Sequence, residues 1–138
     1  MIAQYLWIAA GIPFIVLGTI HLVYTFFGSK LYPRDPSMID EMKRSFITIT
    51  RETTHWKVWI GFNASHSSGV MFIGIMTIYF GLIQYDLIVN SLFLQITILA
   101  TMIFYVVIAR KYWFSIPFAG TAIATILLVT SLLIMHVG

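Results

Sequence analysis

The chain has 138 residues, of which 59% are hydrophobic and only 9% are charged. A soluble domain of this size would not be so apolar, and at about 20 apolar residues per membrane span, four spans use most of the chain. No room is left for a separate soluble domain, and the formal charge of +3 lies in loops, which argues against a nucleic-acid partner. The absence of cysteine excludes disulfides and thiolate metal sites.

Four apolar segments predict an all-α integral membrane protein, a four-helix bundle that forms a single membrane domain. The spans are expected at about residues 4–27, 55–85, 87–109 and 115–136. The first is too long for a signal-peptide core and lacks a basic n-region, so we interpret it as a retained helix. Short connections between successive spans favour an antiparallel arrangement.

The connection between the first two spans contains a segment, about residues 36–49, that we expect to form an amphipathic helix. Asp35 can cap it, and Pro36 suits its first position because the N–H that proline lacks has no partner there. The apolar residues of the segment share one side: Met38, Ile39, Met42, Phe46 and Ile49. It is too polar to cross a bilayer, so we expect an interfacial helix, followed by a polar break at 50–54.

The basic residues predict an orientation. All eight fall in the first and third connections, which four spans place on one side of the membrane: Lys30, Arg34, Lys43, Arg44, Arg51, Lys57, Arg110 and Lys111. The positive-inside rule therefore puts both termini outside and the loop 28–55 in the cytoplasm.

The second span opens with residues 56–69, the most polar run inside any span. Within it Gly61, Ser65 and Gly69 recur every fourth residue. Such a small-residue strip lets a neighbouring helix approach closely, either within the chain, in a second copy or in a larger membrane complex.

Two histidines in the spans predict a polar site. His21 and His66 lie at similar depth in the cytoplasmic half, counting about 1.5 Å per helical residue. Intramembrane ionisable groups are functional candidates, and imidazole can move a proton, bind a carbonyl or ligate a metal. His21 and His66 are therefore our candidate catalytic residues. The candidate ligand-binding residues are Tyr24, Thr25, Trp59 and Asn63, with Arg34 and Asp35 closing the cytoplasmic mouth.

Several interpretations of this constellation stay open. One is a pocket for a small lipidic or quinone-like ligand, with His-mediated proton transfer if the protein is an enzyme. Others are hydrogen bonds that merely join helices, an accessory subunit of a larger membrane complex or homo-oligomer, and a bis-His haem protein. We predict no dedicated metal site, because a zinc site would have to recruit Asp35 or Glu52 from the loop. The sequence leaves the ligand, any cofactor and the existence of an enzymatic activity undecided.

Three motifs lie between residues 18 and 69: Gly18-x-x-His21-Leu22-x-x-Thr25-Phe26, Pro33-Arg34-Asp35, and Trp56-x-x-Trp59-x-Gly61-Phe62-Asn63-x-Ser65-His66-Ser67-x-Gly69. In them the chain resembles an uncharacterised family of small bacterial four-span membrane proteins. The Gly-x-x-His opening is also similar to DoxX-like four-helix membrane proteins, some of which are linked to quinone-coupled redox. The resemblance implies a four-span fold in a bacterial inner membrane and transfers no chemistry.

Overall fold

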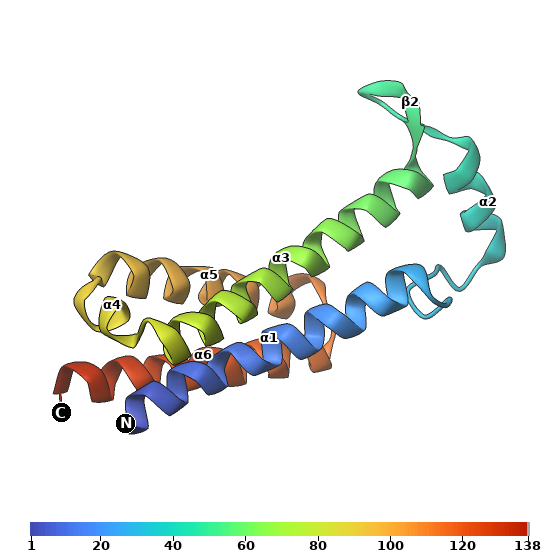
Figure 1. Cartoon of the computed structure of the whole chain (residues 1–138). Coiled ribbons are helices and arrows are strands. Elements are labelled where there is room, and N and C mark those ends of the chain that lie inside the picture. Colours follow the sequence, from blue (N-terminus) through green and yellow to red (C-terminus); the bar gives the residue numbers. More distant parts are fainter. Residues whose placement is uncertain (138) are drawn as a thin grey trace. The chain divides into compact units, whose positions relative to one another are not determined.

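The computed structural model describes residues 1–137, which are predominantly helical (Figure 1). Four helices are long and apolar enough to cross a membrane: α1 (Ile2–Phe26), α3 (His55–Ile83), α5 (Leu92–Tyr112) and α6 (Ser115–Val137). This confirms the predicted all-α four-span membrane fold. The chain forms two compact units, which we call the bundle unit (Met1–Leu17 with Val70–Gly138) and the loop unit (Gly18–Gly69).

The amphipathic helix of the loop unit is shorter than predicted. α2 covers Pro36–Arg44, and Ser45 turns to extended backbone (φ −86°, ψ 135°). An antiparallel hairpin of β1 (Phe46–Ile47) and β2 (Thr50–Thr54) replaces the rest of the predicted helix and the polar break. The reason is composition, because Phe-Ile-Thr-Ile-Thr is a run of aromatic and β-branched residues that favours strands over helix.

The core of the bundle unit forms around Trp7 of α1, which is fully buried. Its indole Nε1–H donates to the Thr77 carbonyl of α3 at 3.0 Å, so burying the ring leaves no unpaired donor. The cluster also contains two further residues of α1 and apolar residues from every other helix of the unit: Ala10, Phe14, Val70, Ile88, Met102, Ala124 and Leu128. At the end that holds both chain termini, Ser131 of α6 donates to the Ala3 carbonyl at 2.6 Å.

The close approach of α1 and α3 in the bundle unit is made by Gly11 and Gly74. A Cβ on Gly11 would lie 2.6 Å from the Gly74 carbonyl oxygen, and one on Gly74 would lie 2.8 Å from the Gly11 oxygen. Backbone therefore touches backbone, which glycine alone allows. The predicted strip behaves differently: Gly61 is exposed, and a Cβ there would meet nothing within 4 Å.

A short helix not predicted from the sequence, α4 (Tyr85–Asn90), links α3 to α5. Gln95 of α5 holds it in place, because its buried Nε2 donates to the Ile88 carbonyl at 2.8 Å. With that amide nitrogen occupied as a donor, Oε1 accepts from Nε2 of His136 on α6, also at 2.8 Å. Gln95 thus joins α4, α5 and α6, the helix-joining role expected of a lone polar side chain in a span.

Most hydroxyls in the long helices bond within their own helix. Thr77 donates to the Ile73 carbonyl at 2.8 Å, and the same bond to the residue four positions earlier is made by Thr25, Ser67, Thr97, Thr101, Thr121, Thr125 and Thr130. This internal pairing removes the cost of placing a hydroxyl in hydrocarbon. Thr101, Thr121 and Thr125 are satisfied in this way inside the bundle unit.

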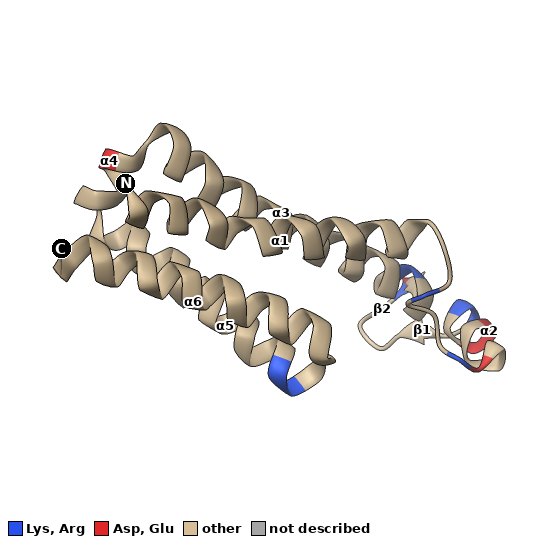
Figure 2. Cartoon of the chain, turned by 90° about the horizontal axis from the view of Figure 1, so that it is seen from below, with Lys and Arg blue, Asp and Glu red and all other residues tan. Residues whose placement is uncertain are grey.

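The charged residues lie at the ends of the long helices and on the loop segments (Figure 2). In the bundle unit Asp86 lies on α4 at one end, whereas Arg110 and Lys111 end α5 at the other. The other six basic residues belong to the loop unit, where α2 and the hairpin carry several of them. Within the bundle unit, the acidic residue and the two basic residues thus lie at opposite ends.

Candidate functional site

The loop unit brings His21 of α1 and Asn63 of α3 into direct contact. His21 Nε2 lies 2.8 Å from Asn63 Oδ1, and both side chains are half-buried. The last turns of α1 and the first turns of α3 run side by side here (Figure 1), so residues 42 positions apart in sequence become partners.

The bonds of Asn63 define the tautomer of His21. The Asn63 amide nitrogen donates to the Trp59 carbonyl one turn earlier, at 2.8 Å, which turns Oδ1 toward the imidazole. An amide oxygen only accepts, so His21 Nε2 must carry a proton and donate it. In the neutral imidazole the second nitrogen, Nδ1, is then the acceptor. Asn63 therefore orients the ring and leaves a basic nitrogen on His21.

His66 lies one turn beyond Asn63 along α3, beside His21. The two ring centroids are 5.7 Å apart with an interplanar angle of 76°, an edge-on contact. On its other side His66 stacks nearly parallel on Phe62, at 6.2 Å and 8°. The Ser67 hydroxyl donates to the Asn63 carbonyl at 2.7 Å, which ties the polar turn together. Both candidate catalytic imidazoles thus belong to one cluster.

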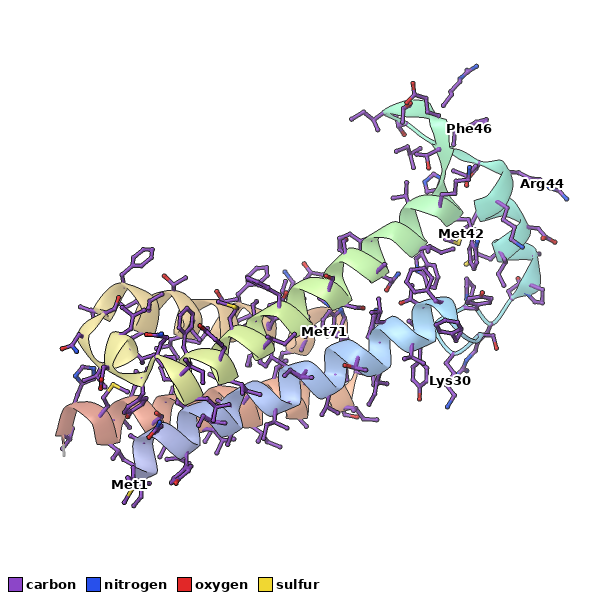
Figure 3. All side chains as sticks on the ribbon, in the orientation of Figure 1. Met1, Lys30, Met42, Arg44, Phe46 and Met71 are labelled. Atoms are coloured by element: carbon purple, nitrogen blue, oxygen red, sulfur yellow. The ribbon has the colours of Figure 1, made fainter. Side chains whose placement is uncertain are left out.

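The two candidates nearest His21 on α1 are engaged differently. Thr25 is buried, and its hydroxyl donates to the His21 carbonyl at 2.8 Å, so it supports the backbone. The phenol oxygen of Tyr24 accepts a bond from Lys30 Nζ at 3.5 Å, and the same ammonium lies 5.0 Å from the Tyr24 ring centroid. Figure 3 shows Lys30 just beyond the end of α1. Tyr24 therefore belongs to the charged end of the helix.

Trp59 contributes its carbonyl to the Asn63 amide, while its ring joins an aromatic cluster. It stacks on Trp56 at 5.2 Å and 17°, and Tyr32 meets the two rings edge-on at 5.0 and 6.1 Å. Lys43 of α2 lies 5.5 Å from the Trp56 ring centroid, within cation–π range. Tyr32 and Trp56 were not predicted as neighbours of the site, although two tryptophans three residues apart at a helix start indicate a shared face.

Arg34 and Asp35 are exposed, and Asp35 serves as the cap of α2. Its Oδ1 accepts from the Ser37 backbone N–H at 2.9 Å and from the Ser37 hydroxyl at 2.8 Å. The hydroxyl bond, followed by the backbone bond, lowers the pKa of Asp35 from its ordinary value of 3.8. Asp35 therefore caps α2, as its position before Pro36 predicted. Its second predicted role, closing the cytoplasmic mouth over a ligand, stays a prediction.

This cap makes the first turn of α2 sensitive to acid. Because the pKa of Asp35 is lower in the folded chain, the cap is complete above pH 3.8 and is lost as pH falls through the lowered value. We expect the amide protection factors of residues 37–39 to fall in acid, and to be low at every pH in Asp35→Ala. Asp35→Asn keeps an acceptor without titrating, so its protection should be pH-independent. Equal wild-type protection at acid and neutral pH would contradict the assignment.

The surface depression of the loop unit does not include the two imidazoles. An open depression of about 520 Å³ lies on α2, away from the imidazoles, and is lined by Ser37, Asp40, Glu41, Arg44 and Ser45. Within residues 1–137, no three His, Asp or Glu side chains gather closely enough to hold a metal ion. His21 and His66 bring together two imidazoles, groups that can form hydrogen bonds and transfer protons.

Comparison of the chain with models of protein families, with curated proteins and with solved structures found no match. The resemblance noted in residues 18–69 stays an expectation, and the function is inferred from the geometry of the site.

Proposed function

We propose that this integral membrane protein binds a small lipidic molecule with a hydroxylated, quinol-like head at His21 and His66. The observation that carries the proposal is the orientation of His21 by Asn63, which leaves Nδ1 as a hydrogen-bond acceptor beside a second imidazole. Intramembrane ionisable residues are rare and mark ligand or proton pathways.

The proposed chemistry is a proton transfer. A hydroxyl of the bound head donates to His21 Nδ1, and when the O–H bond breaks the proton stays on this nitrogen. The resulting imidazolium keeps its Nε2–H bond to Asn63 Oδ1, so the positive charge faces an amide oxygen. His66, in edge contact with His21, is the next group able to receive a proton. Trp59 and Thr25 support this arrangement through backbone contacts.

The ligand is expected to enter sideways from the bilayer. Phe62 and Ser65, the neighbours of Asn63 and His66 on α3, are exposed, and both imidazoles are only half-buried. A lipidic molecule dissolved in acyl chains reaches such a position without crossing water. We place the site in the cytoplasmic half of a bacterial inner membrane, with both termini outside, on the distribution of basic residues.

The accessory-subunit hypothesis is the second candidate. It is favoured by the open surface at Gly61 and Ser65, both exposed on α3, with Gly69 half-buried farther along the strip. A second copy or a larger membrane complex could pack there. The bis-His haem hypothesis stays a prediction, because iron could bind His21 Nδ1 while Nε2–H keeps its bond to Asn63.

The test is a titration of the purified full-length protein in nanodiscs with a short-tailed quinol, followed by quenching of tryptophan fluorescence. Trp56 and Trp59 report from the same unit as the site. We expect His21→Phe and His66→Phe to weaken binding by about tenfold, the loss of one good hydrogen bond. His136→Asn, in the bundle unit, should bind like the wild type. Equal affinity in all four proteins would overturn the proposal.

A further inference from the structure

The β1–β2 hairpin exposes two large apolar side chains, Phe46 at its base, opposite Thr54, and Ile49 in its turn. Phe46 is 51% exposed and Ile49, in the turn, is 88% exposed. Figure 3 shows Phe46 on this hairpin, beside the end of α2. Exposed large apolar residues on a segment outside the spans mark an interaction surface.

The hairpin is fixed to the start of a membrane helix. The His55 backbone N–H, the first of α3, donates to the Ser45 carbonyl at 3.0 Å, and the Ser45 hydroxyl lies 3.1 Å from His55 Nδ1. Trp56 and Trp59 follow at once, the aromatic residues that gather at headgroup depth. β2 has five residues, so at about 3.3 Å per residue the tip stays within roughly 16 Å of α3. The hairpin is therefore held close to the start of α3.

The hairpin and the helix ends next to it are mainly basic, whereas Asp40 and Glu41 lie one turn earlier on α2. Between residues 43 and 57 there are four exposed basic side chains, Lys43, Arg44, Arg51 and Lys57, against one acidic residue, Glu52. In the sequence, Arg44 and Arg51 stand on either side of Phe46 and Ile49. A bilayer surface with anionic headgroups attracts basic segments within a Debye length. The arginines match such headgroups, and the apolar side chains between them match the acyl chains beneath.

We propose that the β1–β2 hairpin docks onto the anionic phospholipid surface of the leaflet on the basic side of the protein. Ile49 and Phe46 enter the boundary between headgroups and acyl chains, while Arg44 and Arg51 bind phosphates. The occupant is lipid rather than a protein segment because the hairpin extends from an interfacial helix start and its charges complement a phosphate layer. The proposal does not depend on the imidazole site.

The chain has no cysteine, which makes a single introduced cysteine a unique attachment point. Ile49→Cys carrying an environment-sensitive dye is reconstituted as full-length protein in nanodiscs of purely zwitterionic lipid or with added anionic lipid. We expect bluer and severalfold brighter emission with anionic lipid. Gln84→Cys, exposed beyond the far end of α3, is the matched control and should be the same in both.

Charge variants then test the phosphate contacts. Arg44→Gln and Arg51→Gln should each lower the docked-to-undocked ratio by about fivefold, the value of one basic residue near an anionic surface. Arg110→Gln, on the connection between α5 and α6, is the charge-matched control and should leave the emission at residue 49 unchanged. Identical emission in the two lipid mixtures would overturn the proposal. So would shielding of the dye only in native vesicles, because that result assigns the hairpin to a protein partner.

Discussion

Gly74→Ala is expected to destabilise the bundle unit by about 2–3 kcal/mol, at the upper end of the cost of overpacking a tight contact. The added methyl would lie 2.8 Å from the Gly11 carbonyl oxygen and 2.9 Å from the Ile15 backbone nitrogen. Both are backbone atoms, so no side-chain rotation relieves the clash and α1 must move away from α3. That movement would also strain the Trp7–Thr77 bond one turn farther along α3. Equilibrium unfolding in mixed micelles measures the loss.

The matched control for Gly74 is Gly61, on the same helix. A methyl at Gly61 meets nothing within 4 Å, so Gly61→Ala should be neutral or stabilising by up to about 1 kcal/mol through helix propensity. Gly11→Ala should behave like Gly74→Ala, and the double variant should cost less than the sum because one separation of the helices relieves both clashes. Equal stability of Gly74→Ala and Gly61→Ala would show that the α1–α3 contact is not close.

Asn63→Leu is expected to have the largest effect on the candidate site. It removes the acceptor that defines the His21 tautomer, and leucine keeps the branched connectivity of the asparagine side chain, with four heavy atoms, although it is bulkier. We expect binding of the quinol probe to fall by at least tenfold, because the ring is no longer held with Nδ1 as the acceptor. The stability cost should be comparable, about 1–2 kcal/mol, because a tenfold loss of affinity is about 1.4 kcal/mol.

Nitrogen NMR of labelled histidine separates orientation from folding. The wild-type His21 signal should be that of the Nε2–H tautomer, whereas Asn63→Leu should show a tautomer mixture with helicity unchanged. Ser65→Ala, an exposed position two residues along α3, is the control and should retain the wild-type signal. An unchanged tautomer in Asn63→Leu would mean that something other than the amide orients the ring.

The sequence predicted the long helices well because hydropathy reports burial in lipid over some 20 residues. The prediction was wrong at residues 46–50, where the helical spacing of apolar residues and the strand-favouring composition point to different structures. Met42, Phe46 and Ile49 fit a helical period, yet the β-branched composition of 46–50 makes a hairpin. The glycines show a different limit: Gly61 stood in a regular strip and is exposed, whereas the closely packed pair is Gly11 and Gly74. Which glycines meet another helix depends on the register between the two helices, and the spacing of glycines within one helix does not encode that register.

Part of the site followed from helix geometry. His21, Asn63 and His66 could be placed together because counting residues from the helix ends gives depth. The tautomer of His21 could not be foreseen, since it depends on the amide of Asn63 donating within α3. The capping role of Asp35 could be foreseen, because its position before Pro36 predicts a helix cap and the structure shows one. Its role toward a ligand stays a prediction.

The hydroxyls bonded within their own helices have a consequence for biogenesis. Thr77 and its counterparts need no second helix, so a newly synthesised segment carrying them can leave the translocon and equilibrate with lipid alone. The amide of Gln95 and the imidazole of His21 are different, because their side-chain partners come from other helices. Lateral assembly of the inserted helices is therefore the stage at which these two groups become satisfied, and a misassembled copy would display them to quality-control proteases.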